Sequence, residues 1–151
     1  MTRLEFAQKA VVMDGDRILL VRKSDQDPYH PGKWELPGGR MKESDDLDTH
    51  LVREVFEETG LTVTVAPDRP IHIWLWHMAW HGEPVRVVAF SRYCRLAKRA
   101  ALKPQRECDD FLSEQRWVPR DELPSLDIIP SQRPTIELVA KEAASCRPAV
   151  E

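Results

Sequence analysis

The sequence has few cysteines, and their spacing forms no recognisable framework. Cys94, Cys108 and Cys146 make no CxxC motif and leave an odd number. A small disulfide-stapled fold needs paired cysteines, and a structural zinc site usually shows two closely spaced pairs. The lack of both patterns argues against these two classes and favours reduced thiols in the cytoplasm.

Long apolar runs and long runs of one charge are also missing. No segment approaches the ~20 apolar residues that a membrane-spanning helix needs, and the start, MTRLEFAQKA, lacks the apolar core of a signal peptide. Lysines and arginines form no extended tract, and the net charge of −3 gives no general attraction to anionic surfaces. We therefore expect a cytoplasmic protein that binds neither a nucleic acid polymer nor a membrane.

What is present is the composition of an ordinary soluble globular protein. Hydrophobic residues make up 42% and charged residues 31% of the chain, which is enough apolar material for a core. A length of 151 residues suits one domain, and we find no internal repeat or linker. We expect a single domain over residues 1–151.

Turn signals divide the chain into short strands and two helices. Two hairpins are expected, one joining residues 10–13 to 17–23 through Asp14-Gly15-Asp16, the other joining 71–80 to 85–96. Further strands are expected at 62–66 and 115–119, and a closing helix at 131–144. An earlier helix should begin after Ser44 as N-cap and end at Gly60. This order predicts a mixed α/β domain with helices packed on a mostly antiparallel or mixed sheet.

The earlier helix carries three glutamates on one side. At 3.6 residues per turn, Glu54, Glu57 and Glu58 project within an arc of roughly 100°. Like charges at this spacing repel, whereas a solvated helix face usually mixes both signs. A hard divalent cation such as Mg²⁺ or Mn²⁺ would remove the repulsion, because both ions prefer oxygen ligands. The adjoining arc is apolar and should pack on the sheet; it holds Leu51, Val52, Val55 and Phe56.

The glutamates belong to a longer pattern of fixed residues. It runs Gly39-x5-Asp45-x7-Arg53-Glu54-Val55-x-Glu57-Glu58-x-Gly60-Leu61, preceded by Gly32-x-Trp34-x-x-Pro37-Gly38. The pattern over residues 39–61 closely resembles the Nudix box of the Nudix hydrolases (MutT-like), and the strand order extends the resemblance to most of the chain. It implies the Nudix fold (α/β, in the α+β sense), an α/β/α sandwich with a mixed sheet and a loop–helix–loop catalytic motif.

The resemblance also implies an activity and a set of site residues. Nudix hydrolases cleave the diphosphate linkage of nucleoside diphosphate derivatives or nucleoside triphosphates, by in-line attack of water with Mg²⁺ or Mn²⁺. By analogy, Glu57 and Glu58 are metal ligands and Glu54 is a ligand or the general base. Arg53 would orient Glu54 or Glu57, and the Gly39 carbonyl would add a neutral metal contact.

Other residues could take part, each with a simpler explanation beside it. In some relatives the base lies on a later loop, where this chain has Glu107, Asp109, Asp110 and Glu114. Solvation at the surface is the explanation we favour for these acids. Arg22 is the best of several loop cations that could contact phosphate oxygens, and Glu114 is a second candidate for substrate binding.

Two positions differ from the usual Nudix pattern. Asp45 replaces a glutamate, which shortens the side chain by one methylene but suits the start of a helix. His50 stands where relatives often have a small residue, one turn before Glu54. It could contact a phosphate or relay a proton, although we favour a partly exposed histidine that bonds to Glu54.

The segment 71–80 is unusually aromatic. Its alternate residues share one strand face: Trp74, Trp76, Met78 and Trp80. Stacking on a nucleobase would explain this, and so would a central strand buried on both sides. We favour core packing for most of them, with one tryptophan at the rim of a pocket.

Two further functions remain as alternatives to the hydrolase. A non-catalytic Nudix-fold module could bind a nucleotide or regulate a partner, although the retained glutamates disfavour it. An isoprenoid-diphosphate isomerase would need a cysteine motif that we do not find. The residues after the box weakly favour a nucleoside triphosphate or another nucleotide derivative as substrate. A homodimer is common in the family, but no interface is readable here.

Overall fold

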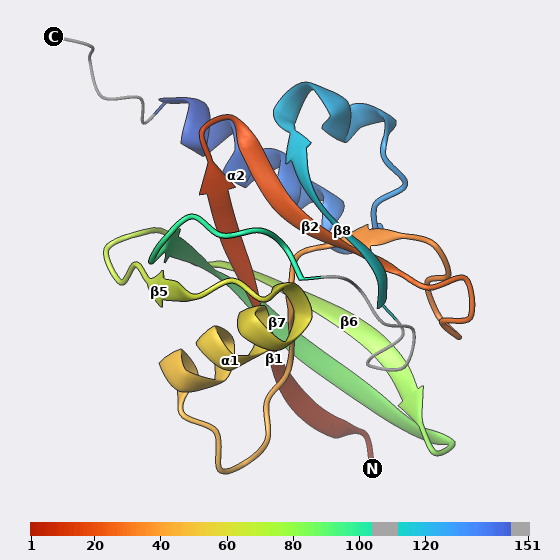
Figure 1. The fold of residues 1–151 in the computed structure, drawn as a ribbon. Coiled ribbons are helices and arrows are strands. Elements are labelled where there is room, and N and C mark those ends of the chain that lie inside the picture. Colours follow the sequence, from red (N-terminus) through yellow and green to blue (C-terminus); the bar gives the residue numbers. More distant parts are fainter. Residues whose placement is uncertain (104–111, 146–151) are drawn as a thin grey trace, which may run out of the picture.

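The structure, a computed structural model, describes residues 1–103 and 112–145 (Figure 1). Its strands are β1 (Arg3–Asp14), β2 (Arg17–Lys23), β3 (Trp34–Glu35), β4 (Gly38–Arg40), β5 (Val63–Val65), β6 (His72–Trp80), β7 (Glu83–Leu96) and β8 (Leu112–Pro119). Its helices are α1 (Leu47–Thr59), the 3₁₀-helix η1 (Arg120–Ser125) and α2 (Arg133–Ser145).

The strands form a mixed sheet in which β1 is the shared member. β1 runs parallel to β7 over ten residue pairs, antiparallel to β4, and antiparallel to β2 at its end. β2 in turn pairs with β3 and β8, while β7 pairs with β5 and β6. Both predicted hairpins are present, with Asp14 opposite Arg17 and Trp80 opposite Glu83. The predicted mixed-sheet fold is confirmed.

Two hydrophobic cores lie on opposite sides of this sheet. Successive strand residues point to opposite faces, so Val11 and Ile18 face one core while Val12 and Leu19 face the other. The first core is completed by α2 and the second by α1, which lie on different sides of the sheet in Figure 1. Burial on both faces explains the short apolar runs at residues 10–13 of β1 and 18–21 of β2.

The N-cap of helix α1 lies two residues later than predicted. Asp46, not Ser44, is the N-cap, and its carboxylate accepts a hydrogen bond from the Thr49 amide at 3.1 Å. At the other end Gly60 adopts a left-handed conformation, and its amide donates to the Phe56 carbonyl at 2.8 Å. The predicted end at Gly60 is therefore confirmed, and the cap at Ser44 was wrong.

Strand β6 is less buried than the sequence suggested. Within the described chain β6 pairs with β7 alone, so it forms an edge of the sheet. Trp74, Trp76 and Met78 are half-buried and pack toward the cluster formed with Val87, whereas Ile73 on the other face is 71% exposed. The expectation of a central strand buried on both sides was wrong.

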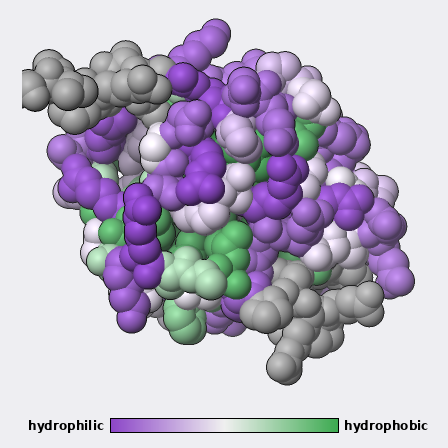
Figure 2. All heavy atoms as spheres, turned by 45° about the horizontal axis from the view of Figure 1, so that its top comes forward, coloured by the Kyte–Doolittle hydropathy of each residue, from purple (hydrophilic) through white to green (hydrophobic). Residues whose placement is uncertain are grey.

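One face of the molecule is mostly polar. Figure 2 shows a largely hydrophilic face on which apolar side chains gather in one area below the centre. The large apolar side chains left exposed include Leu4, Phe6, Phe56 and Ile73. In the part of the chain that the structure describes, no helix is long and apolar enough to cross a membrane.

Candidate active site

The Pro-Gly-Gly segment before α1 packs unusually close to its neighbours. Gly38 has φ of 139°, and a Cβ there would lie 2.1 Å from the Gln8 carbonyl oxygen, so only glycine fits. A Cβ on Gly39 would lie 3.0 Å from Glu54 Oε2. These two glycines therefore allow the backbone of β4 to lie between β1 and the carboxylates of α1.

Glu58 is the most buried of the three glutamates. Its side chain is almost enclosed, and its Oε2 accepts a hydrogen bond from the Gly38 amide at 3.0 Å. Burial raises the pKa of Glu58 to about 8; the nearby Lys9 opposes that rise, and the negative charges of Glu35 and Glu54 add to it. A cation placed beside this carboxyl would favour its charged form.

Glu54 and Glu57 have different surroundings. The Glu54 side chain is largely buried, lies against Gly39, and has Oε1 3.7 Å from His50 Nε2. Glu57 is 54% exposed at its side chain and lies 3.8 Å from Arg53 Nε. The predicted trio therefore consists of one enclosed, one mostly enclosed and one solvent-facing carboxylate.

Arg53 joins two acids on the outer side of the site. Its guanidinium contacts Asp45 at 3.3 Å as well as Glu57. Asp45 also accepts a hydrogen bond from the Lys42 amide at 2.7 Å, and this bond, together with Arg53, lowers the pKa of Asp45. The shorter Asp45 side chain thus ties the loop before α1 to Arg53.

His50 is fully buried, contrary to the expected partial exposure. It lies beneath β1, with Nδ1 2.9 Å from Gln8 Nε2, and its Nε2 is 3.2 Å from the Arg40 carbonyl oxygen. Burial lowers the pKa of His50. Gln8 was not predicted as part of the site, because it precedes the apolar run at residues 10–13 and stands beside a charged residue, Lys9.

A second group of charges lies next to Gly38. Glu35 is buried, with Lys9 Nζ at 3.1 Å and Lys23 Nζ at 3.2 Å from its two oxygens, and it also accepts from Gln132 at 3.0 Å. Burial alone would raise the pKa of Glu35, but the two lysines outweigh it and lower the pKa to about 2. Lys9 also donates to the Gly38 carbonyl at 3.3 Å, so this cluster helps to hold the start of β4 in place.

The two predicted substrate-binding residues lie on β2 and β8. The Arg22 guanidinium donates to the Gly32 carbonyl at 3.1 Å and to Asp25 at 3.2 Å, so it braces the loop that follows β2. Glu114 is exposed and stands opposite Arg22 in the β2–β8 register. Glu107, Asp109 and Asp110 lie outside the described residues.

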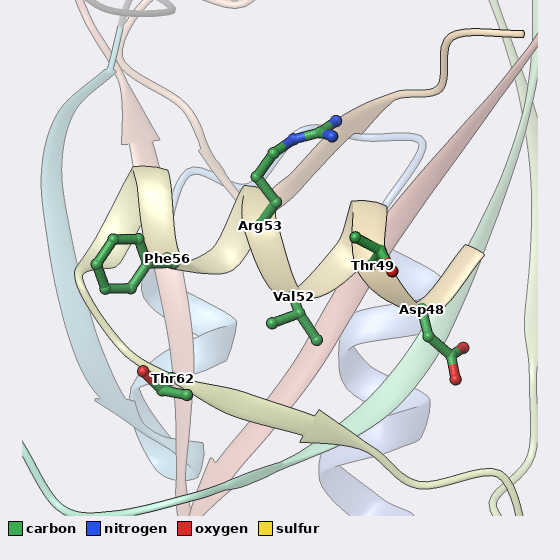
Figure 3. Close-up of a pocket in the computed structure, with 6 residues that line it drawn as sticks. All are labelled: Asp48, Thr49, Val52, Arg53, Phe56 and Thr62. Atoms are coloured by element: carbon green, nitrogen blue, oxygen red, sulfur yellow. The ribbon is translucent and has the colours of Figure 1, made fainter. Parts of the chain in front are cut away.

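A shallow groove lies along α1, on the side of the helix that faces away from the three glutamates (Figure 3). It is lined by Asp48, Thr49, Val52, Arg53, Phe56 and Thr62. Phe56 is 56% exposed there, so its predicted packing on the sheet was wrong. Leu51 and Val55 are buried as predicted, and His50 and Glu58 take the rest of the buried arc.

The residues present suit a cation that is shared with a ligand. Within residues 1–103 and 112–145, no three acidic, histidine or cysteine side chains are arranged to hold a metal by themselves. Glu58 nevertheless offers buried carboxylate oxygens, with Glu54 nearby, and the missing side chain of Gly39 leaves its backbone accessible. Mg²⁺ commonly binds through one or two carboxylates, keeps waters and uses substrate phosphates, which fits this set.

Comparisons with known proteins find relatives that match parts of this chain. A MutT-like protein from Streptomyces ambofaciens is 42% identical over 55 residues, 36% of this chain; the match spans only 32% of that protein. The 8-oxo-dGTP diphosphatase of Escherichia coli (strain K12) is 30% identical over 95 residues, 56% of this chain and 73% of that protein.

Known structures and family models extend the likeness to the whole fold. The crystal structure of the MutT protein from Methanosarcina mazei Go1 superposes with a TM-score of 0.66 at 23% identity, covering 93% of this chain and 96% of that one. A family model described as the NUDIX domain matches residues 5–139, from within the first strand into the last helix. By this match the chain belongs to the Nudix hydrolase family.

Proposed function

We propose that this protein hydrolyses the diphosphate linkage of a nucleoside triphosphate or another nucleoside diphosphate derivative, by in-line attack of water. The observation that carries the proposal is the contact of the Gly38–Gly39 backbone with Glu54 and Glu58. It brings two carboxylates to the same short stretch of backbone, and carboxylate oxygens are donors that suit a hard divalent cation. The family membership and the name of the Escherichia coli relative support a nucleotide as substrate.

Each residue of the site would then have a defined task. Glu58 and the Gly39 carbonyl would hold Mg²⁺ or Mn²⁺, and Glu54 would complete the set or accept the proton of the attacking water. Glu57 faces solvent, where it could share a cation with the incoming phosphates, and Arg53 keeps it in place. The cation, when bound, would neutralise the diphosphate charge and make the attacking water more acidic.

A nucleotide panel tests the proposal. The protein is incubated with Mg²⁺ and each of the common dNTPs, 8-oxo-dGTP, CTP and ADP-ribose, and the products are separated and identified. We expect release of pyrophosphate or of a nucleoside monophosphate from at least one of them, and no release when Mg²⁺ is removed by a chelator. Saturable nucleotide binding in calorimetry without any product would instead support the non-catalytic module.

A further inference from the structure

Gln8 and His50 form a buried hydrogen-bonded pair directly behind the site. Gln8 Nε2 lies 2.9 Å from His50 Nδ1, and the same nitrogen donates to the Leu47 carbonyl at 2.8 Å. A carbonyl oxygen only accepts, so the nitrogen of the Gln8 amide, and not its oxygen, must face both groups. Gln8 therefore presents an N–H to His50 Nδ1.

The other ring nitrogen leads to the same protonation pattern independently. His50 Nε2 is 3.2 Å from the Arg40 carbonyl oxygen, which again can only accept. The neutral ring with its proton on Nε2 satisfies both contacts. A proton on Nδ1 would oppose the N–H of Gln8. Two separate carbonyls, of Leu47 and of Arg40, thus select one tautomer of His50.

The proton on His50 Nε2 faces the backbone of β4, next to Gly39. Arg40 directly follows Gly39, so the hydrogen bond to its carbonyl holds the β4 backbone at the turn of α1 where His50 sits. The same Nε2 lies 3.7 Å from Glu54 Oε1, and both Glu54 oxygens lie close to the position that a Cβ on Gly39 would take. The Glu54 carboxylate therefore lies close to both Gly39 and His50, without a hydrogen bond to the imidazole.

Only the amide nitrogen of the Gln8 side chain is hydrogen-bonded to described residues, and its amide oxygen is not. Its Oε1 has no hydrogen-bond partner among the residues that the structure describes, although the side chain is fully buried. Glutamine therefore gains nothing here through its carbonyl and acts through its two N–H groups. A role in filling space alone would not require them.

We propose that Gln8 and His50 are positioning residues: Gln8 fixes the His50 tautomer, and the His50 N–H holds the Arg40 carbonyl, so that the adjoining Gly39 backbone stays beside Glu54 in the arrangement needed for metal binding and hydrolysis. The inference rests on the proposed function of Glu54 and Gly39. Outer hydrogen-bond partners of this kind orient metal ligands and commonly affect both affinity and turnover.

Nuclear magnetic resonance tests the tautomer without any substrate. In protein labelled with ¹⁵N at histidine, long-range ¹H–¹⁵N spectra distinguish a proton on Nε2 from one on Nδ1. We expect His50 to carry its proton on Nε2, and Gln8→Met, which keeps the size but removes both donors, to produce a mixture of tautomers. A proton on Nδ1 in the unsubstituted protein would overturn the proposal.

A matched pair of variants tests the effect on the site. Asparagine can imitate only Nδ1 of histidine, whereas the longer glutamine can place an N–H near Nε2. We expect His50→Asn to weaken Mn²⁺ binding, measured by electron paramagnetic resonance, and to lower kcat, each by about 10-fold or more, with KM little changed. His50→Gln should recover most of both losses.

The outcomes separate this inference from the proposed function. Circular dichroism first establishes that both variants are folded. If His50→Asn binds Mn²⁺ and turns over nucleotide like the active unsubstituted protein, the positioning role is overturned while the hydrolase proposal stands. If the unsubstituted protein itself neither binds Mn²⁺ nor releases product, the proposed function fails, and this inference fails with it.

Discussion

The Gly38 amide donates a hydrogen bond of 3.0 Å to Glu58 Oε2, which connects β4 to α1, the helix of the Nudix box. Glutamine at position 58 could still accept this bond, but its amide is a poor ligand for a divalent cation beside a carboxylate. We expect Glu58→Gln to lower kcat on the order of 100-fold or more with Mg²⁺ while the protein stays folded. Steady-state kinetics and thermal unfolding check this, with exposed Glu83→Gln as control.

Glu57→Gln should separate activity from stability even more clearly. The contact of Glu57 with Arg53 is largely exposed, and such pairs contribute about 0–1 kcal/mol to stability. We expect a loss of turnover on the order of 100-fold with a nearly unchanged unfolding midpoint. Turnover equal to that of the unsubstituted protein would remove Glu57 from the site.

Gly38→Ala should destabilise the fold far more than Gly15→Ala. Both glycines have positive φ, but a Cβ on Gly38 would lie 2.1 Å from the Gln8 carbonyl oxygen, whereas a Cβ on Gly15 would meet nothing within 4 Å. We expect losses in the free energy of unfolding of about 1 kcal/mol for Gly15→Ala and about 3 kcal/mol or more for Gly38→Ala. Urea denaturation measures both, and similar losses would contradict the close contact.

Stability should fall at acid pH because of Glu35. Its pKa is lowered from 4.5 to about 2 in the folded protein, so the unfolded chain takes up a proton first. The stabilisation is present above about pH 4.5 and is lost as the pH falls toward about 2. Denaturation midpoints across this range should decline for the unsubstituted protein and decline less steeply for Glu35→Gln.

The Glu35→Gln protein should also be less stable at neutral pH, because Lys9 would remain buried without its charge partner. Exposed Glu114→Gln is the control, since it should leave both the midpoint and its pH dependence unchanged. An equal pH dependence in Glu35→Gln would assign the acid sensitivity to other carboxylates.

Tyr93 links β7 to α2, on the face of the sheet opposite to α1. Its hydroxyl donates to Glu142 Oε2 at 2.5 Å, and His72 Nε2 lies 3.3 Å from the same oxygen. We expect Tyr93→Phe to cost about 1.5–3 kcal/mol of unfolding free energy, the usual range for a hydrogen bond to a charged group, without changing kcat. A fall in kcat at full folding would show that α2 influences the site.

Local signals were enough to predict much of the fold and the placing of the motif. The hairpin turns at Asp14-Gly15-Asp16 and at Gly82, and the helix end at Gly60, depend on residues next to each other in the chain. The start of α1 was predicted wrongly, because Ser44 and several neighbouring aspartates are all suitable N-cap residues. Asp46 occupies the N-cap position.

The surroundings of the motif could not be predicted in the same way, because their partners are distant in sequence. His50 is buried by Gln8, 42 residues earlier, and Glu35 is paired with Lys9 and Gln132, which are 26 and 97 residues away. Periodicity describes which side of one helix a residue faces, and it contains no information on which strand will cover that side. The exposure of β6 was missed for the same reason.

Gln8 and Lys9 are consecutive residues of β1 and point to opposite faces of the sheet, one toward His50 and the other toward Glu35. A slip of one residue along β1 would place Lys9 beneath the imidazole in one direction, or Gln8 beside Glu35 in the other. In either case an alanine, Ala10 or Ala7, would take the remaining place. Single-residue insertions or deletions in the first half of this strand should therefore abolish hydrolysis even where a collapsed chain still forms, whereas the same change at the Gly82 turn should be tolerated.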